Sequence, residues 1–175
     1  HTQPAGDAWI PIRAVFPRRG YAVVSPANLK VPVLGPLLPY LGALPVPDGT
    51  DGMKKFQQAI RQRILEKCCI VLYPEAHVWP WCTRIRPFGT ASFTYPVRYK
   101  VPSFCMTTTY QKRRHHKKPK VTVYIDGPFY PDGQMQYKEQ KKGLRDEIYQ
   151  CMLRRSRENT CTYVIYEQET KQKKS

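Results

Sequence analysis

The chain has 175 residues, a length that fits one domain with a sizeable hydrophobic core. Its formal net charge of +16 indicates polyanions or an anionic membrane surface as natural partners. The six cysteines do not indicate a disulfide framework, because no secretory signal is visible and a chain of this length needs no covalent staples. These features favour a reducing, cytosolic compartment.

The N-terminal third is predicted to contain a helix or turn over residues 8–19, followed by short strands. Residues 21–25 are apolar, bounded by glycine and proline, and predict a buried strand. Residues 44–47 can form another strand, which their prolines restrict to a sheet edge or a strand end. The uncharged stretch 31–47 is too short and too rich in proline for a membrane-spanning helix. It is either a buried wall or a surface that contacts a bilayer.

The clearest helix of the sequence runs from Asp51 to Lys67, with Asp51 as a candidate N-cap. Its apolar residues fall on one face: Met53, Phe56, Ile60 and Ile64. Residues 68–73 predict a fully buried strand of a parallel sheet. Strand, crossover helix and strand make a βαβ unit. The predicted fold class is therefore α/β, with a mixed, largely parallel sheet flanked by helices.

The C-terminal half is predicted to continue the same single domain, residues 1–175, without an internal repeat. A basic tail follows the last element at 167–175 and is expected to fray. The predicted elements are a short helix at 88–95, strands at 103–110 and 121–125, a helix at 140–157 and a last strand at 162–166. Residues 126–128, Asp-Gly-Pro, are expected to close the second of these strands.

Two separated segments carry residues suited to base catalysis. His1 precedes Asp7 by a few residues, and Tyr73-Pro74-Glu75 ends the predicted buried strand. Imidazole is the usual base for a weak hydroxyl nucleophile, and a carboxylate on its far nitrogen fixes the tautomer and stabilises the imidazolium. Spacing alone does not distinguish this pair from a surface histidine beside a turn aspartate.

The order of these motifs resembles the lysophospholipid acyltransferase (1-acyl-sn-glycerol-3-phosphate acyltransferase-like) family. That family begins with a His-x4-Asp block and has Phe-Pro-Glu-Gly-Thr-Arg as its third block. Here the third block begins with Tyr73-Pro74-Glu75, and the resemblance covers most of residues 1–110. Further matches are Arg86-Pro87-Phe88 with Ala91-Ser92-Phe93, and Tyr95-Pro96-Val97 at the fourth block.

The chain departs from the family pattern in three places. Five residues rather than four separate the histidine from the aspartate. Ala76, His77 and Val78 stand where Gly, Thr and Arg are expected, and the second block, 42–48, lacks the arginine that the family uses near the acceptor phosphate. The resemblance also implies that the domain lacks its N-terminal segment. We expect a chain beginning at the base itself to be weak or inactive.

The resemblance implies transfer of a fatty acyl group from acyl-CoA or acyl carrier protein to the hydroxyl of a lysophospholipid, with 1-acylglycerol-3-phosphate as the default acceptor. The enzyme would act at the cytoplasmic membrane face, peripherally or anchored by missing N-terminal residues, and would need no cofactor or metal. His1 would be the base, and Asp7 would orient it. An acyltransferase with a different lysolipid acceptor is the alternative.

The resemblance further implies that Glu75 contacts the acceptor. His77 is a further candidate for acceptor binding, and Arg84 or Arg86 can substitute for the missing arginines at its phosphate. Alternatives remain open for each of them. The arginines can be solvated surface charges, and Glu75 can cap a turn or pair with Arg84. The aromatic cluster of His77, Trp79 and Trp81 can line the acceptor pocket, lie in a membrane interface or pack in the core.

A zinc site is disfavoured by the cysteine spacing. Cys68 and Cys69 are adjacent, so that they point to opposite faces of a strand, and the sequence has no Cys-x-x-Cys. Although His77 and Cys82 follow nearby, buried thiols are the favoured interpretation.

A basic run connects the two predicted strands of the C-terminal half. It contains two histidines and six cationic residues: Lys112, Arg113, Arg114, Lys117, Lys118 and Lys120. Each cation near an anionic leaflet contributes on the order of 1 kcal/mol, so this run can hold a protein at an anionic membrane surface. It lacks the interleaved aromatics typical of nucleic-acid binding, and no nucleic-acid partner is expected. The alternatives are a solvated loop, or a non-enzymatic basic module that binds anionic lipid or nucleic acid.

Overall fold

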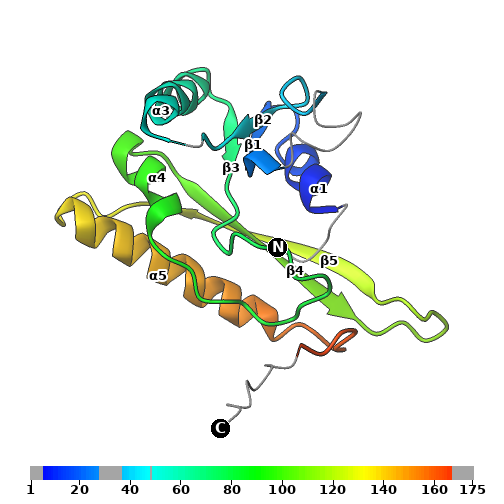
Figure 1. Cartoon of the computed structure of the whole chain (residues 1–175). Helices are drawn as coiled ribbons and strands as arrows, with labels where there is room; N and C mark the ends of the chain where they lie inside the picture. The colour runs from blue at the N-terminus through cyan, green and yellow to red at the C-terminus, as the bar shows by residue number, and fades with distance from the viewer. Residues whose placement is uncertain (1–5, 28–36, 48, 167–175) are drawn as a thin grey trace, which may run out of the picture.

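The computed structural model describes residues 6–27, 37–47 and 49–166, and its fold is α/β as predicted (Figure 1). The first part of the chain forms α1 (Gly6–Ala14), β1 (Gly20–Val24), β2 (Ala43–Pro45), α3 (Thr50–Leu65) and β3 (Cys69–Val71). The second part forms a 3-10 turn η2 (Ala91–Phe93), α4 (Thr94–Tyr99), β4 (Ser103–Gln111), β5 (Lys120–Phe129) and α5 (Tyr137–Ser156).

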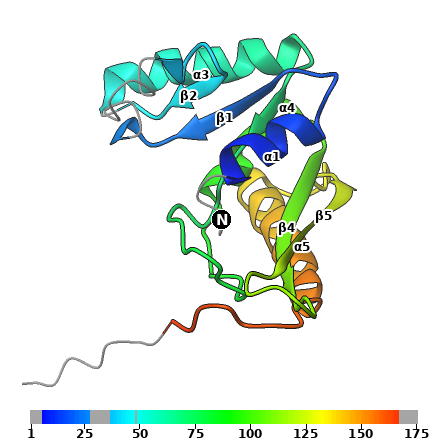
Figure 2. The ribbon, with the colours of Figure 1, turned by 90° about the vertical axis from the view of Figure 1, so that its right-hand side faces the viewer.

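The first part is a parallel sheet of strand order β2-β1-β3, with α1 and α3 on opposite sides of it (Figures 1 and 2). β2 lies at a sheet edge, which confirms the restriction that its prolines imposed. β3 lies at the other edge and is only half-buried, so the expectation of a fully buried strand is wrong. A strand paired on one side only leaves its outer edge accessible.

Close packing at Gly20 places α1 on the sheet. A methyl group at Gly20 would lie 3.1 Å from Val15 Cγ2 and 3.4 Å from Ile12 Cα, both in or just after α1. The glycine therefore lets the helix approach β1 closely. On the other side, α3 buries Phe56 and Ile60 as its periodicity predicted. It begins at Thr50 after Gly49, so Asp51 lies inside the first turn and is not the N-cap.

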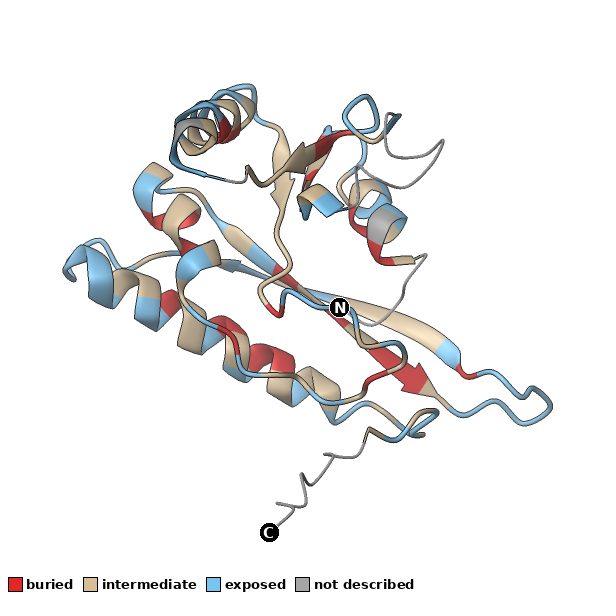
Figure 3. Ribbon diagram, in the orientation of Figure 1, coloured by how far each residue is buried: buried red, intermediate tan, exposed pale blue. Residues whose placement is uncertain are grey.

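The second part is an antiparallel pair, β4–β5, covered by α5. The buried face of α5 presents Leu144, Ile148, Cys151 and Met152 to Phe88, Phe93, Val97 and Cys105. Figure 3 shows buried stretches along α5 and β4, while most of the loop that joins β4 to β5 is exposed. The mixed character predicted for the sheet is therefore distributed over two sheets, one parallel and one antiparallel.

Several predictions for this part differ from the structure. Helix formation begins at Ala91 rather than at 88. β5 does not end at 125 but continues through Asp126, Gly127 and Pro128, because the strand register shifts there. Gly127 makes this shift possible: it adopts φ +131, and a methyl group at this position would lie 2.9 Å from Ser103 O. Residues 162–166 form no strand, since their contacts go to the loop 79–84 instead of a neighbouring strand. The predicted basic tail lies outside the described residues.

In the part of the chain that the structure describes, no helix has both the length and the apolar character needed to span a bilayer.

An ion pair ties β5 to α5. Arg155 Nε and Nη2 donate to Asp126 Oδ2 and Oδ1 at 2.9 and 2.6 Å, and the guanidinium lies 4.5 Å from the centre of the Tyr124 ring. Hydrogen bonds from Arg155 lower the pKa of Asp126 below its ordinary value of 3.8. The pair therefore stabilises the fold at pH values above that ordinary value, and this contribution is lost as the pH falls through the lowered pKa.

We expect Asp126→Asn to destabilise the protein at pH 7 and to cost progressively less below pH 4, because the wild-type carboxylate is then being protonated as well. Urea unfolding across this pH range measures the difference. The control is Asp146→Asn, which breaks a more exposed pair with Arg145 on the same helix and should have a smaller effect at pH 7. Equal effects of the two substitutions would contradict a stabilising role for the Asp126–Arg155 ion pair.

Candidate functional site

The start of α1 lies against the chain segment that leaves β3. Tyr73 donates a hydrogen bond from its hydroxyl to the backbone carbonyl of Asp7, at 2.5 Å. Burial and the nearby Asp7 charge raise the pKa of Tyr73 to about 12. Asp7 itself is only 9% exposed, in the first turn of the helix, where the helix dipole favours a negative charge. The predicted base, His1, lies outside the described residues.

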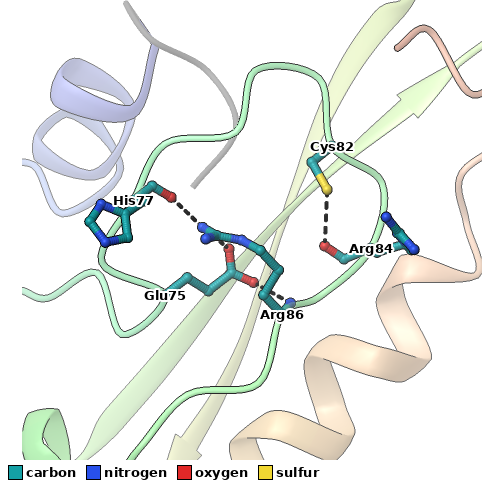
Figure 4. A network of polar contacts seen from close by, with 5 residues as sticks. All are labelled: Glu75, His77, Cys82, Arg84 and Arg86. Atoms are coloured by element: carbon teal, nitrogen blue, oxygen red, sulfur yellow. Dashed lines mark hydrogen bonds and ion pairs between the residues drawn. The ribbon is translucent and has the colours of Figure 1, made fainter. Parts of the chain in front are cut away.

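Glu75 is the centre of a polar network two residues further along (Figure 4). Its side chain is buried, and Oε1 accepts a hydrogen bond from the Arg86 backbone N–H at 2.8 Å. The Arg86 guanidinium contacts Oε2 at 3.3 Å, donates to the His77 carbonyl and lies 4.8 Å from the centre of the Trp79 ring. This carboxylate therefore joins the two ends of the loop 75–86, and its arginine partner is Arg86 rather than Arg84.

The other two predicted binding residues lie at the periphery of this loop. His77 is exposed, and its ring points away from the ion pair while its carbonyl faces Arg86 (Figure 4). Arg84 is exposed and donates to the Tyr166 carbonyl at 3.2 Å. The cavity that Glu75 and Arg84 line with Thr107 has a volume of about 20 Å³. Sites for small organic ligands occupy roughly 300–1,000 Å³, so any acceptor must bind outside this cavity.

The turn that carries Glu75 has a strained backbone at one position where the chain departs from the family pattern. Ala76 N–H donates to the Tyr73 carbonyl at 3.0 Å, and His77 N–H donates to the Glu75 carbonyl at 2.8 Å. This tight turn holds Ala76 at φ +64, in the left-handed region that glycine adopts most readily. Glycine is the residue expected at this position from the resemblance, and the backbone geometry that favours it is present here with alanine.

The aromatic cluster predicted beside Glu75 packs within the protein. Trp79 contacts Tyr166 with ring centres 4.9 Å apart. Trp81 contacts Tyr110 of β4 at 5.3 Å and Tyr163 at 4.9 Å. The tryptophans thus attach the segment after α5 to the loop 75–86, which favours packing as their role. His77 does not belong to these ring contacts.

One group of possible metal ligands occurs in the described residues, away from the predicted site. The ligand atoms of Cys105, Asp126 and Cys151 all lie within 4.8 Å of one another. Both oxygens of this carboxylate already accept hydrogen bonds from Arg155, and burial with the neighbouring Cys151 raises the pKa of Cys105 to about 12, which opposes the thiolate that a metal requires. We therefore interpret both cysteines as packed thiols. The four residues tested for zinc from the sequence are not part of this group.

The structure thus brings the Asp7 backbone to Tyr73 and, separately, pairs Glu75 with Arg86. Sequence reasoning missed the Tyr73 hydroxyl, which joins the start of α1 to the segment that carries Glu75. The signal was present, because a tyrosine directly before Pro-Glu carries a polar group where the family has phenylalanine.

A comparison with models of known protein families finds no match, and a comparison with curated proteins finds none. Among solved structures, the chain is similar to the crystal structure of the 1-acyl-sn-glycerophosphate (LPA) acyltransferase PlsC from Thermotoga maritima. The identity is 17% and the TM-score 0.49, and the match covers 77% of this chain and 56% of that chain. The chain thus spans little more than half of that protein. The activity of this chain does not follow from this likeness.

The two arginines of the loop should differ in their effect on stability. Arg86→Ala leaves the buried Glu75 carboxylate without its guanidinium, and we expect a loss of about 1.5–3 kcal/mol in the free energy of unfolding. Arg84→Ala removes a contact to one exposed carbonyl and should change it by less than about 0.5 kcal/mol. Urea unfolding of both variants measures these changes. Similar losses of unfolding free energy in the two variants would be inconsistent with Arg86 as the partner of Glu75.

Ala76→Gly should stabilise the protein by about 0.5–1 kcal/mol, since relief of the left-handed strain exceeds the greater entropy of glycine in the unfolded chain. Ala59→Gly is the control, because this alanine lies inside α3 and its replacement should destabilise by about 1 kcal/mol. Thermal unfolding measures both. Destabilisation by both substitutions would argue against strain at position 76.

Proposed function

We propose that the chain is an acyltransferase that moves a fatty acyl group from acyl-CoA or acyl carrier protein to the hydroxyl of a lysophospholipid. One observation carries the proposal. Two segments that resemble the first and third blocks of the lysophospholipid acyltransferase family, 66 residues apart, meet where Tyr73 bonds Asp7. The meeting point follows the carboxyl end of a parallel strand, the edge at which open α/β sheets place their sites.

In the proposed reaction, His1 takes the proton of the acceptor hydroxyl while the hydroxyl oxygen attacks the thioester carbonyl. The new carbon–oxygen bond forms, the carbon–sulfur bond breaks, and the proton passes from the imidazolium to the departing thiolate. Asp7 orients the imidazole and stabilises its charged form. Because Asp7 is buried, its charge acts on the imidazolium with less screening by water than an exposed carboxylate would.

Acceptor binding is assigned to the exposed side of the loop 75–86. Glu75 and Arg86 neutralise each other, so that Arg86 acts on the acceptor by holding the carboxylate in place. Arg84 is exposed and can offer its remaining N–H groups to a phosphate, with His77 at the same rim. 1-Acylglycerol-3-phosphate is the default acceptor in this proposal, and another lysolipid is the alternative.

The membrane side of the proposal uses the β4–β5 loop. Its five cationic residues and Lys120, the first residue of β5, are all exposed, which suits contact with the anionic lipids of a cytoplasmic leaflet. The same exposure favours the second candidate function, a non-enzymatic module that binds anionic lipid or nucleic acid through this loop.

Thiol release from an acyl-CoA, followed with a panel of lysophospholipids, tests the proposal. The protein is assayed with residues placed before His1, so that the imidazole has no α-ammonium group beside it. We expect acceptor-dependent turnover, and His1→Ala or Asp7→Ala should lower kcat at least about 100-fold.

Matched controls are His115→Ala and Asp132→Ala, because both residues are exposed and lie outside the proposed site. They should retain wild-type turnover. A folded protein that binds anionic vesicles or nucleic acid, yet releases no thiol with any donor and acceptor, would support the binding module instead.

A further inference from the structure

The loop at the end of the β4–β5 hairpin borders an open cavity of about 330 Å³. One wall comes from the basic loop and the other from the segment that follows α5. The lining includes Lys112, Arg113, His116, Lys117, Thr160 and Tyr163. Its volume falls within the range of about 300–1,000 Å³ found for small-molecule sites.

Two hydrogen bonds hold the end of β4 and the segment after α5 together. Thr160 N–H donates to the Tyr110 carbonyl at 3.0 Å, and Lys112 N–H donates to Thr160 Oγ1 at 2.9 Å. Tyr163 is fixed by its ring contact with Trp81. The end of β4 and the segment from 160 therefore form a defined concave site in place of a loose loop.

The charge of this cavity is one-sided. Three cationic side chains and a histidine line it, and no aspartate or glutamate does. Among the described residues, none of the ion pairs involves Lys112, Arg113 or Lys117. Cations that converge on a hollow without carboxylates repel one another, and a ligand with several negative charges relieves this repulsion.

We propose that this cavity binds the phosphorylated nucleotide end of the acyl donor, which makes the donor acyl-CoA rather than acyl carrier protein. The inference rests on the proposed acyltransferase function. Coenzyme A carries a 3′-phosphate and a 5′-diphosphate on one adenosine, a compact group of negative charges that suits converging lysines and arginine. Tyr163 is exposed at the cavity and offers a ring on which adenine can stack.

The shape of the site favours this ligand over larger anions. An acidic carrier protein or a bilayer presents a broad surface, and the cations that meet such a surface point outward. Arg114 and Lys118 belong to the same loop but do not line the cavity. The loop thus divides into an inner set of cations for the nucleotide and an outer set available to the membrane.

The cavity is connected to the loop 75–86, which carries the proposed acceptor surface, along one continuous segment. Residues 160–163 border the cavity, and three residues later Tyr166 bonds Pro80 O through its hydroxyl at 2.7 Å and packs against Trp79. Trp79 in turn lies against Arg86, the partner of Glu75. The four steps from Thr162 to Tyr166 span at most about 14 Å. The long pantetheine arm of coenzyme A can follow this segment and carry the thioester towards Glu75.

Calorimetric titration with adenosine 3′,5′-bisphosphate tests the site without requiring turnover. We expect saturable binding of the bisphosphate, and markedly weaker binding when adenosine 5′-monophosphate is titrated in its place. The triple variant Lys112→Gln, Arg113→Gln and Lys117→Gln should bind at least about tenfold more weakly, as expected from the loss of even one charge-assisted contact.

The matched control is Arg114→Gln with Lys118→Gln, which removes charge from the outer side of the same loop. It should change the affinity for the bisphosphate by less than about threefold, because exposed charges outside the site act only through screened, long-range attraction. An equal loss per charge in both variants would indicate a diffuse polyanion surface and overturn the proposal. The proposal would also be overturned if the wild type shows no saturable binding of the bisphosphate. This holds even if the protein binds acyl carrier protein or vesicles.

The failure of this inference is distinguishable from the failure of the acyltransferase function. If the triple variant turns over acyl-CoA with the same KM as the wild type, the acyltransferase function stands and the proposed nucleotide site is refuted. Specific bisphosphate binding by a protein that transfers no acyl group would establish the nucleotide site. It would refute the acyltransferase function, and with it the assignment of this cavity as the acyl-donor site.

Discussion

The buried carboxylate of Glu75 is the constraint on which the candidate site depends. A buried charge is tolerated only when it is paired and hydrogen-bonded. Here the backbone and guanidinium of Arg86 supply both, and this closes the loop between the parallel sheet and the α5 layer. Closing the loop places His77 and Arg84 on its outer side and brings Trp79 against Arg86. The same carboxylate therefore fixes the loop, its aromatic contacts and the proposed acceptor surface.

The two sheets have different roles. The parallel sheet positions α1 through the close approach at Gly20 and delivers the turn at Ala76. The antiparallel pair, held under α5, supports the basic hairpin and the segment that follows the helix. Contacts of Trp79 and Trp81 join the two parts. A reaction that needs an acceptor surface and a donor site can thus use one part of the chain for each.

Much of the fold could be predicted because local pattern determines it. The one-sided apolar periodicity of α3 and α5 predicted both helices, and the proline content of β2 predicted an edge strand. The strand expected at 162–166 failed although its residues have high strand propensity. A strand needs a neighbour to complete its hydrogen bonds, and the available neighbour was a loop. β5 continued past Asp126 because Gly127 can adopt the backbone conformation that the register shift requires.

For the site, the sequence by itself determined which residue types were present and in what order: an aspartate near the start, an aromatic-Pro-Glu turn, two arginines after it and a basic loop. The tertiary structure decided which of them meet. It paired Glu75 with Arg86 instead of Arg84, joined Asp7 to Tyr73 and folded residues 160–163 against the basic loop so that both border an open cavity. Propensity and periodicity act over a few residues, whereas partners 66 residues apart are selected by packing and by the need to satisfy buried polar groups.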